Sequence, residues 1–383
     1  MGKKTFIGVG GTARKSKKIY IGVNNKARKV KKMYIGVNNV ARCIFGGGEL
    51  SYSKQLEFNV GRFSHSATSI GKSFAVFNLG RRDSSDSSII EAFNEHLTRY
   101  STSNYVSTNL YNAAAASVGV YALFAGGTAG DGGSNMVQGC DASMTAIKLA
   151  SALVATSKNL AGASAGNYAL FGGGDSGYGS FHTHVTAYDK SLTRTTPTGL
   201  SHGRSYLSAT SFGDYVLFGG GYSDDDSALD TVDAYDKSLT RTNPTGLSVA
   251  RRDLAATSIE KYALFGGGIN MVGGVNYSNV VDAYNLSLTK VAVPNLSVGR
   301  RYLAATSVEN YALFGGGVYV TSSAIYSNTV DAYDESLTRT NPQGLSSARD
   351  EFAAASVGNY ALFGGGYAPT NIYGKVVDVY EVS

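Results

Sequence analysis

The sequence predicts an all-β fold built from seven copies of one structural unit. A motif close to YALFGGG recurs every 47 or 49 residues, opening at Phe74, Tyr121, Tyr168, Tyr215, Tyr262, Tyr311 and Tyr360. Gly is abundant, with 48 residues, and Trp is absent, a composition that suits short strands joined by tight turns. Each unit also contains several strand-like runs. A repeat of this length with several strands is typical of a propeller blade, so we expect a seven-bladed β-propeller.

Residues 251–296 show how one unit makes four antiparallel strands. Two runs, 254–258 and 262–265, are joined by a short turn, and two more follow at 280–285 and 288–293. Four antiparallel strands make one blade. The first strand is rich in Ala, Ser and Thr, so we expect it to line the narrow central channel, and the Gly triplet should let neighbouring backbones approach closely.

The two ends of the repeat region predict how the ring closes. The last unit contains a third strand, VVDVYEVS, with no fourth strand after it. Residues 50–60, LSYSKQLEFNV, precede the first unit and have the character of the missing strand. We therefore expect this amino-terminal strand to complete the last blade, which would remove free sheet edges from the ring.

These repeats resemble the blades of kelch-type propellers, which carry a glycine doublet after the second strand and an aromatic residue further along. The resemblance covers about residues 50–383. Doublets begin at Gly172, Gly219, Gly266, Gly315 and Gly364, and the aromatic residues are Tyr188, Tyr235, Tyr284, Tyr333 and Tyr380. The usual kelch tryptophan is absent, and Asn78 and Ala125 interrupt the first two glycine runs. The resemblance implies a divergent kelch-like propeller.

Residues 1–48 carry a different repeat of 14 residues: FIGVGGTARKSKKI, YIGVNNKARKVKKM and YIGVNNVARCIF. Gly10-Gly11, Asn24-Asn25 and Asn38-Asn39 suit two-residue hairpin turns. We expect a sheet of three hairpins with one apolar and one basic surface. The predicted domains are therefore a basic β-hairpin module at 1–48 and the propeller at 49–383.

Charge also separates these two modules. Residues 1–48 contain 12 Lys and Arg and no Asp or Glu, whereas the remainder has 22 basic and 28 acidic residues. So small a module buries too little surface to be firmly stable alone, so we expect it to dock on a partner. The expected anchoring residues are Lys15, Lys17, Lys18, Arg28, Lys29, Lys31 and Lys32. A nucleic-acid-binding face, which we disfavour, and a merely solvated face are the alternatives.

The pairing of lysine-rich YIGVNN repeats with a propeller looks like proteins encoded by phages and prophages of Gram-positive bacteria. That resemblance implies a virion component of a tail, baseplate or capsid surface, with other particle proteins as partners and homo-oligomers within the particle as one arrangement. No apolar run is long enough to cross a membrane, and the amino terminus lacks a secretion signal. A glycan-active enzyme and a cytoplasmic interaction adaptor remain alternatives.

Two sets of residues are candidates for ligand binding. The loops between second and third strands vary and contain Tyr178, Tyr222, Tyr277, Tyr319, Tyr326 and Tyr367, a composition suited to a host-surface glycan or protein. An arginine recurs before the first strand in five of the seven units, at Arg62, Arg204, Arg251, Arg300 and Arg349, of which the last four are the candidates for ligand binding. These arginines either form a ring of cations at the channel mouth or pair with Asp233, Asp282, Asp331 and Asp378 to hold the blades.

The sequence predicts no catalytic residue, cofactor or metal site. His182 and His184 form one loop pair and Asp224 to Asp226 form an acidic run, but neither has a complete ligand set. Cys43 and Cys140 have no metal-ligand spacing and indicate no disulfide framework. We therefore expect a non-enzymatic structural and binding protein.

Overall fold

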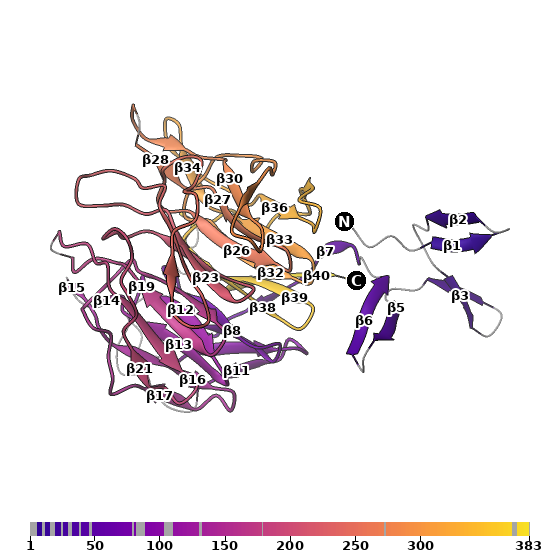
Figure 1. Ribbon diagram of the computed structural model, residues 1–383, viewed down its shortest axis with the longest axis horizontal. Helices are drawn as coiled ribbons and strands as arrows, with labels where there is room; N and C mark the ends of the chain where they lie inside the picture. Colours follow the sequence, from indigo (N-terminus) through magenta and orange to yellow (C-terminus); the bar gives the residue numbers. More distant parts are fainter. Residues whose placement is uncertain are drawn as a thin grey trace. The chain divides into compact units, whose positions relative to one another are not determined.

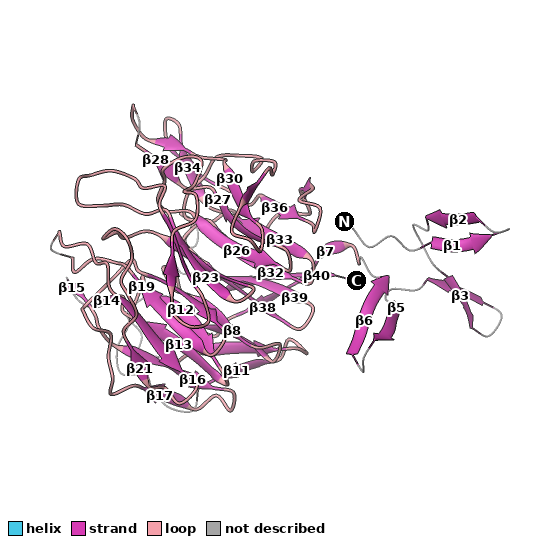
Figure 2. Ribbon diagram, viewed as in Figure 1, coloured by secondary structure: helices cyan, strands magenta, loops and turns pink. Residues whose placement is uncertain are grey.

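The structure is a computed structural model that describes residues 6–9, 12–15, 20–23, 26–29, 33–37, 40–45, 48–78, 80–81, 89–102, 110–129, 132–177, 179–271, 273–369 and 374–382, with the backbone alone up to residue 45. The chain divides into two compact units, Met1–Ser51 with Val382–Ser383, and Tyr52–Glu381 (Figure 1). Every regular element in the described residues is a strand (Figure 2). These residues contain no helix that could cross a membrane.

Seven four-stranded antiparallel sheets make up the propeller, and six of them take their strands in chain order. Blade 1 contains β8 (Ala67–Ile70), β9 (Phe74–Phe77), β10 (Glu91–Asn94) and β11 (Arg99–Ser101); blade 2 contains β12 (Ala114–Val118), β13 (Tyr121–Ala125), β16 (Val137–Asp141) and β17 (Ala146–Lys148); blade 3 contains β18 (Ala161–Ala165), β19 (Tyr168–Gly172), β20 (Val185–Asp189) and β21 (Arg194–Thr195). Blade 4 contains β22 (Ser208–Phe212), β23 (Tyr215–Gly219), β24 (Val232–Tyr235) and β25 (Arg241–Thr242); blade 5 contains β26 (Ala255–Ile259), β27 (Tyr262–Gly266), β30 (Val281–Tyr284) and β31 (Lys290–Val291); blade 6 contains β32 (Ala304–Val308), β33 (Tyr311–Gly315), β36 (Val330–Tyr333) and β37 (Arg339–Thr340). The predicted seven-bladed propeller is confirmed.

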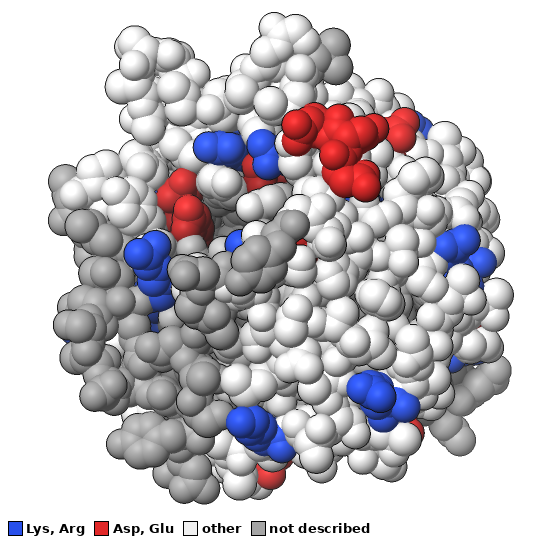
Figure 3. All heavy atoms as spheres, turned by 90° about the vertical axis from the view of Figure 1, so that its left-hand side faces the viewer, with Lys and Arg blue, Asp and Glu red and all other residues white. Residues whose placement is uncertain are grey.

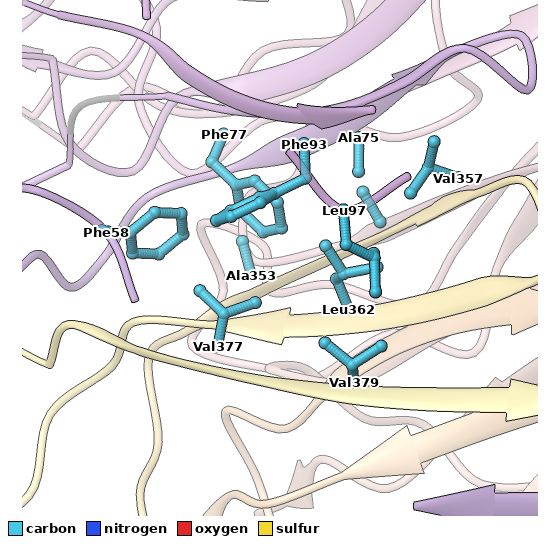
Figure 4. Packing of buried hydrophobic residues seen from close by; sticks show 11 residues of the cluster. Phe58, Ala75, Phe77, Phe93, Leu97, Ala353, Val357, Leu362, Val377 and Val379 are labelled. Atoms are coloured by element: carbon cyan, nitrogen blue, oxygen red, sulfur yellow. The ribbon is translucent and has the colours of Figure 1, made fainter. Parts of the chain in front are cut away.

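The seventh blade is built from both ends of the propeller sequence. Its strands are β38 (Ala353–Val357), β39 (Tyr360–Gly364), β40 (Val376–Val382) and, in the fourth place, β7 (Leu50–Glu57). Immediately after β7, the Phe58 ring lies 5.1 Å from the ring centre of Phe77 and 5.9 Å from that of Phe93, both in blade 1 (Figure 4). The predicted closure is confirmed, and aromatic packing joins its seam to the first blade.

The first strands surround the central channel, as the sequence predicts. A space of about 260 Å³ is lined by residues 67–69, 115–117, 162–164, 209–211, 256–258, 305–307 and 354–355. Serines connect neighbouring first strands: Ser164 Oγ donates to the Ser117 carbonyl at 2.6 Å, and the Ser164 N–H donates to Ser211 Oγ at 2.9 Å. Small side chains therefore both fill the narrow ring and bridge it.

The glycine triplets allow neighbouring blades to pack closely. A Cβ on Gly219 would lie 2.7 Å from the Phe265 ring of the next blade. The following residue, Gly220, has a φ of +68°, and a Cβ there would lie 2.6 Å from the carbonyl oxygen of Arg251. Both positions exclude larger side chains, the first by contact and the second by contact and backbone conformation.

Buried tyrosines on the third strands attach five of the blades to the segment that arrives from the previous one. Five hydroxyls donate to backbone carbonyls at 2.7 to 2.9 Å: Tyr188 to Ser151, Tyr235 to Thr198, Tyr284 to Thr245, Tyr333 to Pro294 and Tyr380 to Gln343. Blade 2 has Cys140 in this place, a buried free cysteine whose thiol pKa is raised to about 12 by burial. This repeated aromatic position belongs to the scaffold.

Short hairpins extend three of the loops between second and third strands. They are formed by β14 (Thr128–Ala129) with β15 (Gly132–Gly133), β28 (Ile269–Asn270) with β29 (Asn276–Tyr277), and β34 (Val318–Val320) with β35 (Ala324–Tyr326). The hairpins β28–β29 and β34–β35 each lie in one of the two repeats of 49 residues and account for their extra length. These hairpins belong to blades 2, 5 and 6.

The amino-terminal unit contains three separate hairpins: β1 (Phe6–Val9) with β2 (Thr12–Lys15), β3 (Tyr20–Val23) with β4 (Lys26–Lys29), and β5 (Met33–Val37) with β6 (Val40–Phe45). Each two-residue gap falls where the sequence predicts a turn. The described strands do not join into the single three-hairpin sheet that we expected. In the second hairpin, Tyr20 pairs with Lys29 and Ile21 with Arg28, so this register gives no support to separate apolar and basic surfaces.

Candidate functional site at the channel mouth

The four candidate arginines, which belong to the set of five repeated ones, are buried in ion pairs and do not line the channel mouth. Each is at most 2% exposed. The guanidinium nitrogens lie 2.7 to 2.9 Å from carboxylate oxygens on third strands: Arg204 with Asp233, Arg251 with Asp282, Arg300 with Asp331 and Arg349 with Asp378. Pairing with these aspartates, one of the two alternatives left open by the sequence, is therefore confirmed. The expectation that Arg204, Arg251, Arg300 and Arg349 present cations to a ligand is wrong, because each guanidinium is already engaged by a carboxylate and none of the four lines the channel mouth.

The same pairing explains the two blades in which the arginine is missing. Arg62 pairs with Glu91 in blade 1. Blades 2 and 3 have Leu110 and Ser157 in the arginine position and Gln138 and Thr186 in the acid position. All four are buried. An unpaired buried charge would be costly, so the charged partners are present together or replaced together.

The predicted loop tyrosines lie on the face that carries the second-to-third loops, but they do not converge on one point. Tyr178 lies outside the described residues, and the other five, which are Tyr222, Tyr277, Tyr319, Tyr326 and Tyr367, are half-buried. Tyr326, Tyr367 and Phe63 make a row across blades 6, 7 and 1, with successive ring centres 5.8 and 5.7 Å apart. Tyr222 packs separately, with Arg252 4.4 Å above its ring.

A second set of residues, which we call the mouth ring, surrounds the channel on the side where each chain segment enters its first strand. It contains one residue from every blade: Ser64, Asn112, Asn159, Tyr206, Asp253, Tyr302 and Glu351. All seven have a positive φ, between 49° and 56°. Their backbones also form a closed circle, because each N–H donates to the carbonyl of the mouth-ring residue in the preceding blade at 2.8 to 3.3 Å.

The mouth ring encloses a cavity of about 390 Å³. Its floor is formed by the next residue of each blade, which is apolar in six cases and His65 in the first: His65, Ala113, Leu160, Leu207, Leu254, Leu303 and Phe352. Figure 3 faces the side on which β14 and β15 lie in Figure 1 and shows a hollow with acidic and basic atoms at its rim. A polar rim above an apolar floor is typical of a small-molecule site, and the volume lies within the usual range.

Burial strongly perturbs two carboxyl groups, that of Asp253 in the mouth ring and that of Asp350, which precedes the mouth-ring residue Glu351 in the chain. The Asp253 side chain is 1% exposed, neither of its oxygens has a hydrogen bond, and the nearest cation is Arg301, whose Nη1 lies 3.8 Å from Oδ2. Burial raises the pKa of Asp253 to about 6. Burial and the nearby Glu351 raise the pKa of the neighbouring Asp350 to about 7.

The remaining candidates from the sequence form no metal site in the described residues, which contain no cluster of three His, Cys, Asp or Glu suited to an ion. His182 and His184 contact each other, with their Nδ1 atoms 3.4 Å apart. Asp225 accepts hydrogen bonds from Ser223 and Ser227, which together lower its pKa. Asp225 is therefore satisfied by the serines beside it, whereas His182 Nε2 is buried without a hydrogen-bond partner among the described residues.

The mouth ring is the part of the molecule that the sequence analysis missed. Each of the five repeated arginines is followed two residues later by a mouth-ring residue, in the segments GRFS, GRSY, ARRD, GRRY and ARDE. The signal in the sequence is the position two residues after each repeated arginine, where the residue type changes from blade to blade. Because its residue type does not repeat, this position does not stand out beside the repeated motifs.

Comparison with known proteins identifies the fold alone. No protein-family model matches the chain, and no curated protein matches it. Many solved structures are similar, among them a propeller protein called YjhT, with a TM-score of 0.59 and 15% sequence identity over 75% of this chain and 99% of that one. At this identity the likeness establishes the propeller architecture and nothing about activity. The chain is thus a seven-bladed β-propeller protein.

Proposed function

We propose that this protein is a non-enzymatic binding and structural component of a phage-like particle, built on a divergent kelch-like propeller. The basic hairpin module attaches it to other particle proteins. The second-to-third loops face outward and recognise a glycan or protein of the host surface. The proposal rests on the apolar residues displayed by those loops and on the charge split between the modules.

The observation that carries the proposal is the position of the exposed apolar side chains. Eight large hydrophobic residues are exposed among the described residues, and four of them lie on the β28–β29 and β34–β35 hairpins of consecutive blades: Met271, Val275, Val320 and Ile325. Tyr277, Tyr319 and Tyr326 are on the same hairpins. Exposed apolar groups gathered on the hairpins of two consecutive blades, with tyrosines beside them, favour contact with a partner.

The enzyme alternative loses the residues on which it depended. It required a ring of accessible arginines at the channel mouth, and the side chains of Arg251 and Arg300 are completely buried in their ion pairs. The loop tyrosines also lie in separate groups rather than around one reacting centre. A binding role needs neither an accessible cation nor converging groups, so the geometry favours it over catalysis.

Charge substitutions on one hairpin test the recognition face. We expect Val320→Asp with Ile325→Asp to abolish adsorption of the fluorescently labelled protein to host cells, because both side chains are exposed and the changes add charge to the contact. Val120→Asp is a suitable control, since Val120 is 53% exposed in the turn between β12 and β13. Equal adsorption by the hairpin variant and the control would contradict the proposed recognition face.

Attachment through the basic module is tested separately. We expect the full chain carrying Lys29→Glu, Lys31→Glu and Lys32→Glu to be lost from purified particles. The matched control places the same three changes on exposed lysines of the propeller, Lys54, Lys72 and Lys237. Retention of the module variant at the level of the control would contradict attachment by these residues, and absence of the unmodified protein from particles would contradict the particle role.

A further inference from the structure

The mouth ring repeats its backbone in all seven blades but not its side chains. Every member has a positive φ, and a non-glycine residue in that region is strained by about 1 to 2 kcal/mol. Glycine would relieve this strain, and the chain uses glycine freely at other positive-φ sites. The backbone circle explains the conformation, but it does not explain why Tyr206, Tyr302 and Glu351 occupy it. Some of these side chains have partners within the fold: Arg252 lies over the Tyr206 ring, Arg301 lies over the Tyr302 ring, and Ser64 Oγ donates to Glu351. These contacts leave the Asp253 carboxylate without a hydrogen bond, so the fold accounts for only part of the ring.

The mouth ring is also entirely polar, whereas the floor below it is mostly apolar. Its amides and hydroxyls can each donate and accept hydrogen bonds, and its two carboxylates accept them. This mixture matches ligand hydroxyl groups, which both donate and accept. An inorganic anion would be repelled by Asp253 and Glu351, and the described residues offer no three-ligand cluster for a metal ion.

The Asp253 carboxylate gives the clearest indication of which ligand the cavity suits. Its charge is already opposed by Arg301 on one side, and Arg252 also acts electrostatically on it. Its hydrogen-bonding capacity is unused, because neither buried carboxylate oxygen has a donor. A buried acceptor without a donor is expensive, so the arrangement calls for a neutral ligand that donates hydrogen bonds rather than for a further cation.

We propose that the mouth cavity binds a polyhydroxylated ligand of one or two sugar rings, with Asp253 accepting hydrogen bonds from its hydroxyls. Tyr206 and Tyr302 flank Asp253 in the ring and supply a further hydroxyl on each side, above an apolar floor that packs on the carbon face of the sugar. This site is distinct from the outer hairpins, and the proposal holds whether or not those hairpins bind a host surface.

Titration with free sugars tests the site. Maltose and N,N′-diacetylchitobiose serve as ring-containing probes and sorbitol as an open-chain polyol, each followed by calorimetry with the full-length protein. We expect at least one ring-containing probe to bind, and Asp253→Asn to weaken it by about tenfold or more, since a hydrogen bond to a charged group is lost. Asparagine tolerates a positive φ, so the variant keeps the backbone circle.

Two further variants keep the test decisive. Asp214→Asn makes the same chemical change in the exposed turn between β22 and β23, where Asp214 pairs with Lys237, and should leave sugar binding unchanged. Tyr302→Phe should weaken binding severalfold without altering the melting temperature. Failure of every probe to bind the unmodified protein would overturn the proposal. So would binding that Asp253→Asn and Tyr302→Phe leave intact.

Discussion

The blade interior and the mouth ring use repetition in opposite ways. In the blade interior the side chains repeat with the backbone, so that Arg251, Asp282 and Tyr284 have counterparts in most other blades. In the mouth ring the backbone repeats in all seven blades, but its residues are Ser, Asn, Asn, Tyr, Asp, Tyr and Glu. Side chains that hold the blades together recur in most blades, and where the ion pair is missing, in blades 2 and 3, both partners are replaced. Side chains that vary on a fixed backbone are free to recognise something.

Residues with a positive φ also differ between the turns of the blades and the mouth ring. Besides the mouth ring, six residues in the turns after the third strands have φ between 56° and 62°: Leu97, Met144, Leu192, Leu239, Leu288 and Leu337. These are all apolar and contribute to the hydrophobic clusters of the blades. In the turns, packing explains both the conformation and the residue type. In the mouth ring the backbone circle explains the conformation, whereas contacts such as that of Arg301 over the Tyr302 ring explain only part of the residue types.

The largest expected effect comes from breaking one buried ion pair of the blade interior. Arg251→Ala removes the close partner of the buried Asp282 carboxylate and leaves only Lys290, 3.7 Å away, beside it, and we expect this to lower the free energy of unfolding by about 3 to 5 kcal/mol. Denaturant unfolding measures this change. Because the unpaired charge causes most of the loss, Arg251→Leu combined with Asp282→Gln should recover much of it, since blade 2 has Leu110 and Gln138 in these places.

The double variant decides between two explanations of the repeated pair. If Arg251→Leu with Asp282→Gln is as unstable as Arg251→Ala, then the ion pair itself stabilises the blade and blades 2 and 3 must compensate elsewhere. If stability returns, then the charges are needed only because each is present. The second result would support the interpretation that the two partners are either present together or replaced together.

A smaller effect of opposite sign is expected in the mouth ring. Asp253 has a folded-state pKa of about 6, raised mainly by burial, against about 4 when unfolded. Folding therefore favours the protonated acid, and this contribution to stability is present below pH 4 and is lost as the pH rises through 6. Asp253→Asn removes the titration, so its stability should exceed that of the unmodified protein by about 3 kcal/mol at pH 8 and by much less at pH 4.

The difference between the two proteins at each pH is the informative measurement. The other charged groups that act on Asp253 are Arg252, Arg301 and Glu351, and all remain in the variant. Burial lowers the pKa of His65 well below its usual range, which costs stability as the pH falls below 6.5, but this contribution is common to both proteins and cancels. A stability difference that does not grow between pH 4 and pH 8 would contradict the buried, unbonded state of Asp253.

Most of the fold could be predicted from the sequence because the residues that form the scaffold repeat from blade to blade. The spacing of YALFGGG predicted the seven blades, the incomplete last unit located β7, and the recurrence of arginine with aspartate suggested the ion pairs. The mouth ring could not be found in this way. Its members share a positive φ, which a glycine at these positions would have suggested, but a tyrosine such as Tyr302 or a glutamate such as Glu351 gives no sign of it in the sequence.

The smallest prediction compares one chemical change in the two regions. Tyr284→Phe removes a hydroxyl that donates to the Thr245 carbonyl at 2.8 Å, so we expect the free energy of unfolding to fall by about 1 kcal/mol with sugar binding unchanged. Tyr302→Phe removes a hydroxyl from the mouth ring and should do the reverse, weakening sugar binding at constant stability. Thermal unfolding and calorimetry on both variants measure the two quantities. If both variants lost stability and neither lost binding, then the mouth ring would be scaffold like the blade interior, because its hydroxyls would serve only the fold.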